Sequence, residues 1–204
     1  SAASDVYKRQ QLDGKRESYT ICLVDGDKLV IAGTETVATL HGMYHISEKI
    51  GVSPWKWWAD VKPEKADELY INLPKDGYTE DEPSVQYRGI FLNDEYNLNQ
   101  WSTSMGDGNM TKETYEKIYE LILRLKANTL WPAMHQYSNA FHLDAENAVL
   151  ADKYGIVMGS SHAEPLLRNN LGELYPYQQQ WLADHPDKKL YINTKDDSGR
   201  SVSY

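Results

Sequence analysis

The sequence predicts an α/β protein made of two parts. In the second part, strand-like and helix-like segments alternate: strands at 86–92, 129–131 and 156–158 are separated by helices at 111–127 and 144–154. This alternation is typical of parallel strands joined by crossover helices. In the first part, a strand pair followed by a helix predicts a small α/β unit that precedes the parallel sheet.

Composition excludes several classes of protein. With 41% hydrophobic and 25% charged residues among 204, the chain can bury a core. No apolar run reaches the length of a spanning helix, and the N-terminus lacks the pattern of a signal peptide. A net charge of -9 disfavours nucleic acid as a partner, and the lone Cys22 permits neither an internal disulfide nor a cysteine zinc pair. Oligomeric state and metal dependence do not follow from the sequence.

We divide the chain into three stretches. Residues 1–10 have no helical or strand period and look like translated linker sequence. Residues 11–83 form the predicted N-terminal α/β domain, and residues 84–204 form the second region. The acidic, turn-rich segment 74–84 separates them, and its proline, glycine and charge content disfavours regular structure. Both ends look cut, so we expect an internal fragment.

Local signals place the elements of the first domain. Strands at 18–24 and 28–32 flank an Asp25-Gly26-Asp27 turn typical of a hairpin. A helix is predicted from Glu35 to Ile50, ended by Gly51. Further along, Leu69, Ile71 and Leu73 alternate with polar residues and predict a short strand. In the second region, the predicted caps are Asn128 after one helix and Gly155 after the next.

The second region is either the start of a (β/α)₈ barrel or a small doubly wound sheet. It is less than half of the about 250 residues of a complete barrel. In both architectures ligands bind at the carboxyl ends of the strands. The residues there are Asn93, Asp94 and Glu95 after the first strand, Trp131 at the second, and His162 and Glu164 after the third. Carboxylates and imidazole exchange protons and hold hydroxyls, and an indole packs on a sugar ring, so we predict a carbohydrate site.

Each of these residues also has a structural interpretation. Asp94 and Glu95 could cap the loop that follows, and Trp131 could lie in the core. His162 and Glu164 could form a hydrogen-bonded pair at a helix start. The indoles of Trp55, Trp57 and Trp58 could form an exposed sugar platform, although packing between the two domains fits them better.

Three common motifs are incomplete. His41 and His45 have the spacing of a zinc helix, but Gly42 occupies the position of its general-base glutamate, so no metal is predicted. The segment 159–163 approaches a nucleophile elbow, but Ala163 replaces the final glycine. No phosphate-binding glycine loop is present, so no nucleotide cofactor is predicted.

Four blocks of sequence, in order along 28–168, closely resemble glycoside hydrolase family 115, the xylan α-1,2-glucuronidases. The blocks are HISEKIGVSPWKWWADV (45–61), YRGIFLNDE (87–95), LKANTLWPAM (125–134) and YGIVMGSSHAEP (154–165).

The resemblance implies a small N-terminal α/β domain followed by the first three βα units of an incomplete (β/α)₈ barrel. It also implies a secreted or periplasmic, inverting enzyme that removes glucuronic acid or its 4-O-methyl derivative from glucuronoxylan or a related glycan. Carried over, the catalytic positions are Asp94 and Glu164, and the substrate-binding positions are Asn93, Glu95, Trp131 and His162. The principal acid and base are expected on later strands, so the fragment alone is expected to be inactive.

The sequence departs from the family pattern at 34–38 and after Arg168, which leaves the exact glycan open. Two rival functions are a non-catalytic glycan-binding module that uses Trp55, Trp57 and Trp58, and a barrel glycosidase with a different sugar specificity.

Overall fold

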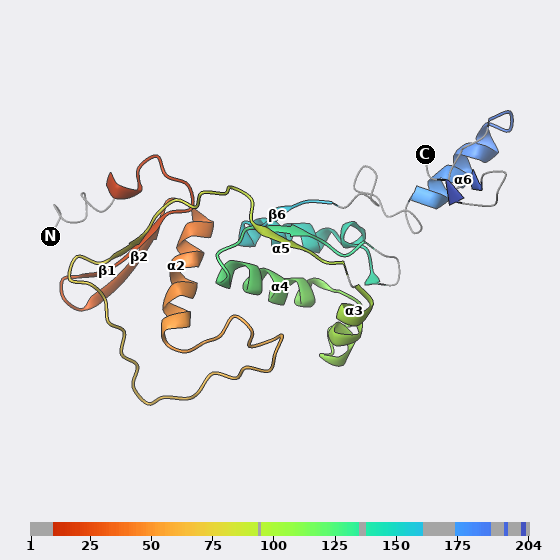
Figure 1. Ribbon diagram of the computed structural model, residues 1–204. Coiled ribbons are helices and arrows are strands. Elements are labelled where there is room, and N and C mark those ends of the chain that lie inside the picture. Colours follow the sequence, from red (N-terminus) through yellow and green to blue (C-terminus); the bar gives the residue numbers. More distant parts are fainter. Residues whose placement is uncertain are drawn as a thin grey trace.

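The protein is described by a computed structural model that covers residues 10–93, 95–134, 138–160, 174–188, 194–195 and 201–202. It contains two three-stranded sheets with helices packed beside them (Figure 1). The first sheet has the order β2-β1-β3 and the second the order β4-β5-β6. The architecture is therefore mixed α/β, as predicted.

The first sheet is antiparallel and begins with the predicted hairpin. β1 (Tyr19–Val24) pairs with β2 (Lys28–Gly33) along its whole length. Three residues, Asp25, Gly26 and Asp27, connect the two strands, and Asp25 at φ 56° and Gly26 at φ 84° lie in the left-handed region. On its other edge β1 pairs with β3 (Tyr78–Glu80).

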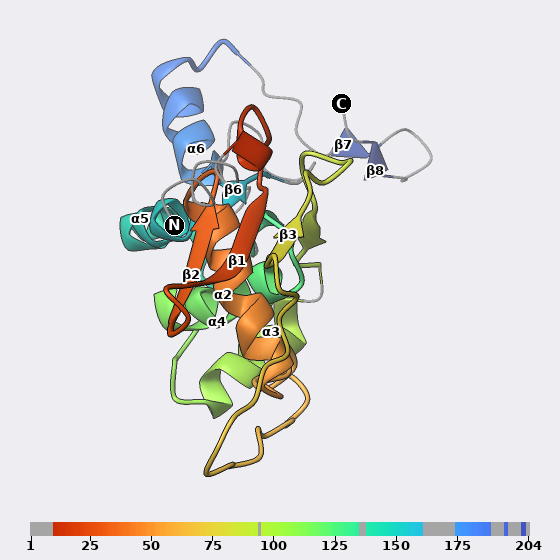
Figure 2. The same ribbon diagram turned by 90° about the vertical axis from the view of Figure 1, so that its left-hand side faces the viewer.

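α2 (Thr36–Lys49) lies between this sheet and α4 (Lys112–Arg124), as Figures 1 and 2 show. On the sheet side, Ala38 packs with Tyr19 and Ile21 in one buried cluster. Val37 belongs instead to the larger core that α4 shares with the second sheet. Gly51, at φ 91°, follows the helix as predicted and donates its N–H to Glu48.

The second sheet is parallel, which confirms the prediction from alternating strands and helices. β5 (Thr129–Trp131) is the central strand, flanked by β4 (Gly89–Phe91) and β6 (Val157–Met158). α4 and α5 (Ala145–Tyr154) pack with one face of this sheet. The core there includes Leu130 of β5, the strand-flanking residues Leu92 and Ile156, and the apolar stripe of α4. Barrel closure stays a prediction.

Both ends of α5 match local rules. Asp144 is the N-cap, and its carboxylate accepts the N–H of Glu146 at 2.9 Å. Gly155 follows the helix at φ 67° in the left-handed region, as predicted. The structure also contains the 3₁₀ helix η2 (Phe141–Leu143) and the helix α6 (Tyr175–Asp184). Near the C-terminus, β7 (Thr194–Lys195) and β8 (Ser201–Val202) form a short antiparallel pair.

Three local predictions were wrong, and one helix was missed. Residues 69–73 form no strand, because they have no neighbouring strand to pair with and the side chain of Leu69 is 57% exposed. The segment 74–84 is not wholly irregular, since β3 lies within it and pairs with β1. No helix was predicted between the strand at 86–92 and the helix at 111–127, where α3 (Glu95–Ser104) lies. The left-handed residue after α4 is Lys126, at φ 56°, rather than Asn128.

Candidate functional site at the strand ends

The carboxyl ends of the three parallel strands lie side by side. Phe91 is paired with Trp131, and Leu130 with Met158, so β4, β5 and β6 end at nearly the same level. Two backbone hydrogen bonds connect the residues at these ends. The N–H of Leu92 donates to the carbonyl of Trp131 at 3.0 Å, and the N–H of Gly159 donates to the carbonyl of Leu130 at 2.8 Å. Side chains that leave the sheet here therefore share one edge.

Trp131 is accessible at this edge. Its side chain is 42% exposed, whereas the preceding Leu130 is fully buried beneath α4 and α5. Because side chains alternate along a strand, Trp131 points to the sheet face opposite these helices. Phe91 lies on the same face, with its ring centroid 5.4 Å from that of Trp131 and the two planes at 64°. Within the described residues, Trp131 is therefore not part of the buried core.

This second face of the sheet is uncovered within the described part of the chain. Phe91, Thr129, Trp131 and Val157 share it, and Val157 is 43% exposed. A shallow hollow of about 330 Å³ is lined by Tyr87, Gly89, Ile90, Phe91, Thr129 and Trp131. Parallel sheets are normally covered on both faces, so we expect further structure or a ligand on this face.

The structure locates only some of the predicted site residues. Asn93 is exposed two residues after β4, and Glu95 begins α3, although its side chain is not described. Asp94, His162 and Glu164 lie outside the described residues. The site roles of all six residues therefore stay predictions. Phe91 and Gly159, which contact or adjoin Trp131, were not among the predicted site residues. Their signal was positional, since each lies at the end of a predicted strand.

The three clustered indoles do not form a common exposed platform. Trp57 donates its Nε1–H to Glu120 of α4 at 2.7 Å, and Lys56 lies 4.4 Å from the centre of the same ring. Trp58 stacks on Trp101 of α3, with centroids 4.4 Å apart. Both rings thus attach the segment after α2 to the second region, in agreement with the packing interpretation. Trp55 is 46% exposed.

The two histidines of α2 have structural hydrogen bonds. His41 is buried, and its Nε2 lies 3.3 Å from the carbonyl oxygen of Ala127. His45 places Nδ1 2.9 Å from the hydroxyl of Tyr19. Burial is the main reason that the pKa values of both histidines are lowered. In the described ranges no group of histidine, cysteine and carboxylate side chains has a metal-binding arrangement.

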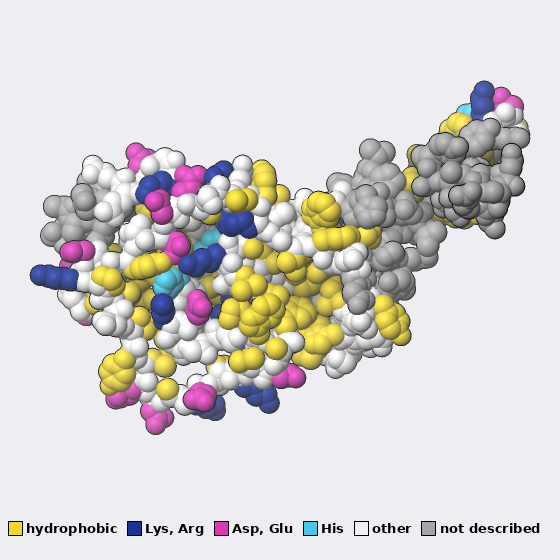
Figure 3. Space-filling view, viewed as in Figure 1, with side chains coloured by type: hydrophobic (Ala, Val, Ile, Leu, Met, Phe, Trp, Pro, Cys, Tyr) yellow, Lys and Arg dark blue, Asp and Glu magenta, His cyan; other side chains and the backbone are white. Residues whose placement is uncertain are grey.

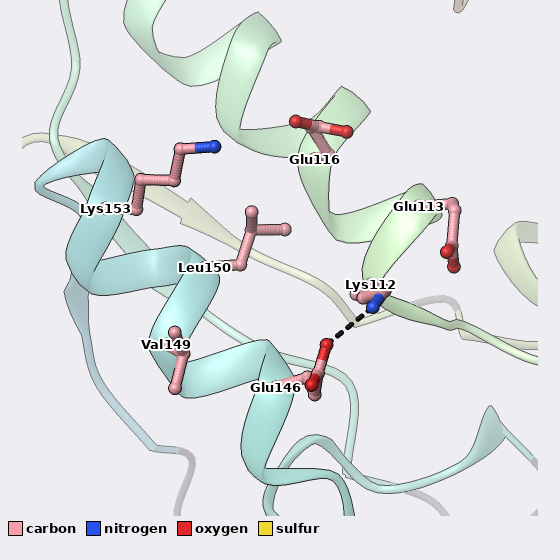
Figure 4. Close-up of a pocket in the computed structure, with 7 residues that line it drawn as sticks. All are labelled: Lys112, Glu113, Glu116, Glu146, Val149, Leu150 and Lys153. Carbon is pink, nitrogen blue, oxygen red and sulfur yellow. Dashed lines mark hydrogen bonds and ion pairs between the residues drawn. The ribbon is translucent and has the colours of Figure 1, made fainter.

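A second hollow, of about 200 Å³, lies between α4 and α5 (Figure 4). Lys112 and Glu146 form an ion pair of 2.5 Å across it, and Glu113 and Glu116 add two further carboxylates. These helices cover the face of the sheet opposite Trp131. Three carboxylates outnumber the two lysines, Lys112 and Lys153, so the hollow has a net negative charge and is a poor candidate for a uronate site.

Comparison with known proteins identifies the family. The family model described as glycosyl hydrolase family 115 matches residues 80–196. The chain belongs to glycosyl hydrolase family 115.

Among solved structures, a family GH115 4-O-methyl-α-glucuronidase with specificity for decorated arabinogalactans is similar to this chain. The two share 38% sequence identity, with a TM-score of 0.70 over 92% of this chain and 24% of that structure. This family 115 chain thus spans about a quarter of the length of the neighbour. A comparison with curated proteins gave no match. No helix in the described ranges is long and apolar enough to cross a membrane.

Proposed function

We propose that this chain supplies the first wall of the sugar pocket in an α-glucuronidase. In this proposal, residues 11–83 are a small α/β domain, and residues 84–204 begin a (β/α)₈ barrel of which β4, β5 and β6 are the first strands. The observation that carries it is the parallel sheet with helices on one face and an accessible indole at its strand ends. In a barrel, the uncovered face would be the interior.

The substrate we propose is a glycan that bears glucuronic acid or its 4-O-methyl derivative. Trp131 would stack on the apolar face of the sugar ring. His162 is the one predicted site residue whose side chain can carry a positive charge, which suits it to the uronate carboxylate. Asn93 and Glu95 would bind ring hydroxyls.

Hydrolysis with inversion requires an acid and a base separated by roughly 6.5 to 9.5 Å, with a water between the base and the sugar. Asp94 would hold the water or the ring hydroxyls next to it, and Glu164 would tune or assist the acid. The principal acid and base would come from later barrel strands, so the 204 residues alone would release no sugar. Export from the cell, which the resemblance implies, belongs to the same proposal.

The test is release of glucuronic acid by the whole protein from glucuronoxylan and from arabinogalactan. Asp94→Ala should lower turnover by on the order of 10² or more, because positioned proton-transfer groups contribute that much. Asp152→Asn is the control, since Asp152 is exposed on α5, on the other side of the sheet. Turnover of Asp94→Ala equal to that of the control would remove Asp94 from the mechanism.

Two arms of the assay address the substrate. Release from only one glycan would identify the preferred backbone. Failure to release uronic acid from either glycan, together with release of another sugar, would replace the proposal with a barrel glycosidase of different specificity.

A further inference from the structure

Gly159 lies in direct contact with the indole of Trp131. A Cβ atom added to Gly159 would lie 2.2 Å from Cδ1 and 2.3 Å from Nε1 of that ring. The third nearest atom, at 3.4 Å, is Cε2 of the same indole. Real Cβ atoms do not approach other atoms so closely, so the ring occupies the space that any side chain at residue 159 would need.

The backbone at Gly159 cannot easily move away from the ring. Its N–H donates to the carbonyl of Leu130 at 2.8 Å, which continues the β5–β6 pairing beyond Met158. On the other side of the indole, the edge-on ring of Phe91 lies 5.4 Å away by centroids. Trp131 is thus held across the sheet, between the end of β4 and the residue after β6.

We propose that Gly159 is a positioning residue that sets the orientation of the Trp131 indole toward a bound uronic acid ring. The inference rests on the proposed function, which makes Trp131 the stacking surface. Trp131 is 42% exposed, so part of its ring remains accessible while Gly159 and Phe91 fix the rest. An indole has only two rotatable side-chain bonds, so a clash at its five-membered ring turns the whole plane.

Gly159→Ala in the whole protein tests the proposal. We expect KM for the uronic-acid-bearing glycan to rise about tenfold, because the variant loses one well-oriented aromatic contact. The value of kcat should stay within about threefold, because a stacking contact is made equally in the ground state and the transition state. In a Trp131→Ala background, Gly159→Ala should change neither parameter further, since the atoms it would meet are gone.

Gly26→Ala is the matched control. Gly26 lies in the β1–β2 turn at φ 84° with open space around its Cβ position, so this change strains the backbone and lowers stability without moving Trp131. KM should be unaffected. A KM for Gly159→Ala within twofold of this control would overturn the proposal, and so would an equal rise of KM in the Trp131→Ala background.

Folding and optical measurements keep the proposal testable independently of activity. Gly159→Ala should change the near-ultraviolet circular dichroism of the tryptophans, and the Trp131→Ala, Gly159→Ala double variant should unfold at the same temperature as Trp131→Ala alone. If both variants that carry Gly159→Ala fail to fold, the clash is not with the indole and the proposal is wrong. If the whole protein releases no uronic acid but these two optical and thermal results hold, the proposed function fails while Gly159 still positions Trp131.

Discussion

At the scale of residues, burial determines the pKa of the histidine at position 41 of α2. His41 is 3% exposed on α2, beneath the junction with the second sheet. Burial lowers the pKa of His41 below its usual 6.5, and the charges of Arg88 and Lys126 act in the same direction. The hydrogen bond to Ala127 and the charge of Glu17 oppose this lowering but do not outweigh it.

This pKa makes stability depend on pH. Below about pH 6.5 the unfolded chain binds a proton at residue 41 that the folded chain binds only at lower pH, so the free energy of unfolding falls as the pH falls. In His41→Gln this part of the pH dependence should be absent. Thermal unfolding midpoints at pH 7.5, 6.5 and 5.5 would measure it, and the exposed His185→Gln is the control. A slope in His41→Gln equal to that of the unchanged protein would contradict the prediction.

At the scale of elements, α5 depends on its C-terminal glycine for two reasons. Gly155 adopts φ 67°, and a Cβ there would lie 2.3 Å from Cγ2 of Val37 on α2. Gly51 after α2 also has a positive φ of 91°, but nothing lies near its Cβ position. A side chain at residue 51 would therefore strain only the backbone, whereas a side chain at residue 155 would also clash with α2.

We predict that Gly51→Ala lowers the free energy of unfolding by about 1 kcal/mol, the cost of the left-handed conformation for a residue with a Cβ. Gly155→Ala should cost about 1 to 3 kcal/mol more, because the new methyl group overlaps Val37. In a Val37→Ala background that excess should disappear. Denaturation of all four variants measures the difference, and equal losses for the two glycines would show that the α2–α5 contact is unimportant.

Elements with a strong local signal were predictable from the sequence, and those without one were not. The Asp25-Gly26 turn and the Gly155 cap are local chemistry, and both were found where the sequence indicated. α3 was missed because its sequence, EYNLNQWSTS, has no apolar stripe at helical spacing. β3 was missed because it owes its conformation to pairing with β1, more than fifty residues earlier in the chain.

The candidate site also has a part that the sequence predicts and a part that it does not. Alternation of strands and helices was enough to bring Trp131 to a shared strand edge. Its contact with Gly159 could not be predicted, because it depends on the register of β6 and on the rotamer of the indole.

At the scale of the whole molecule, a polar junction joins the two sheets. Figure 3 shows acidic, basic and histidine side chains interspersed over α2 and the neighbouring sheet, whereas hydrophobic side chains gather over α4. Within the junction, Glu17 precedes β1 and forms an ion pair with Arg88, which precedes β4. Asn128, at the start of β5, donates to Glu17 at 2.5 Å and to the carbonyl of Gln86 at 2.8 Å.

We predict that Glu17→Gln destabilises the protein by about 2 kcal/mol, because it leaves Arg88 without its carboxylate in a largely buried setting. Glu82→Gln is the matched control. Glu82 pairs with Arg16 at 2.7 Å, but both side chains are more than a third exposed, so its loss should cost less than about 1 kcal/mol. Unfolding midpoints of the two variants give the comparison, and equal shifts would mean that the junction does not stabilise the fold.

The bond between Glu17 and Asn128 joins residues 111 positions apart. During synthesis the first hairpin and α2 leave the ribosome well before β5 does. Until β5 emerges, Glu17 therefore lacks its hydrogen bond from Asn128. Nascent chains arrested before and after Asn128 has emerged from the ribosome should therefore differ in protease resistance near Glu17. The N-terminal sheet should reach its final stability only when the parallel strands have formed.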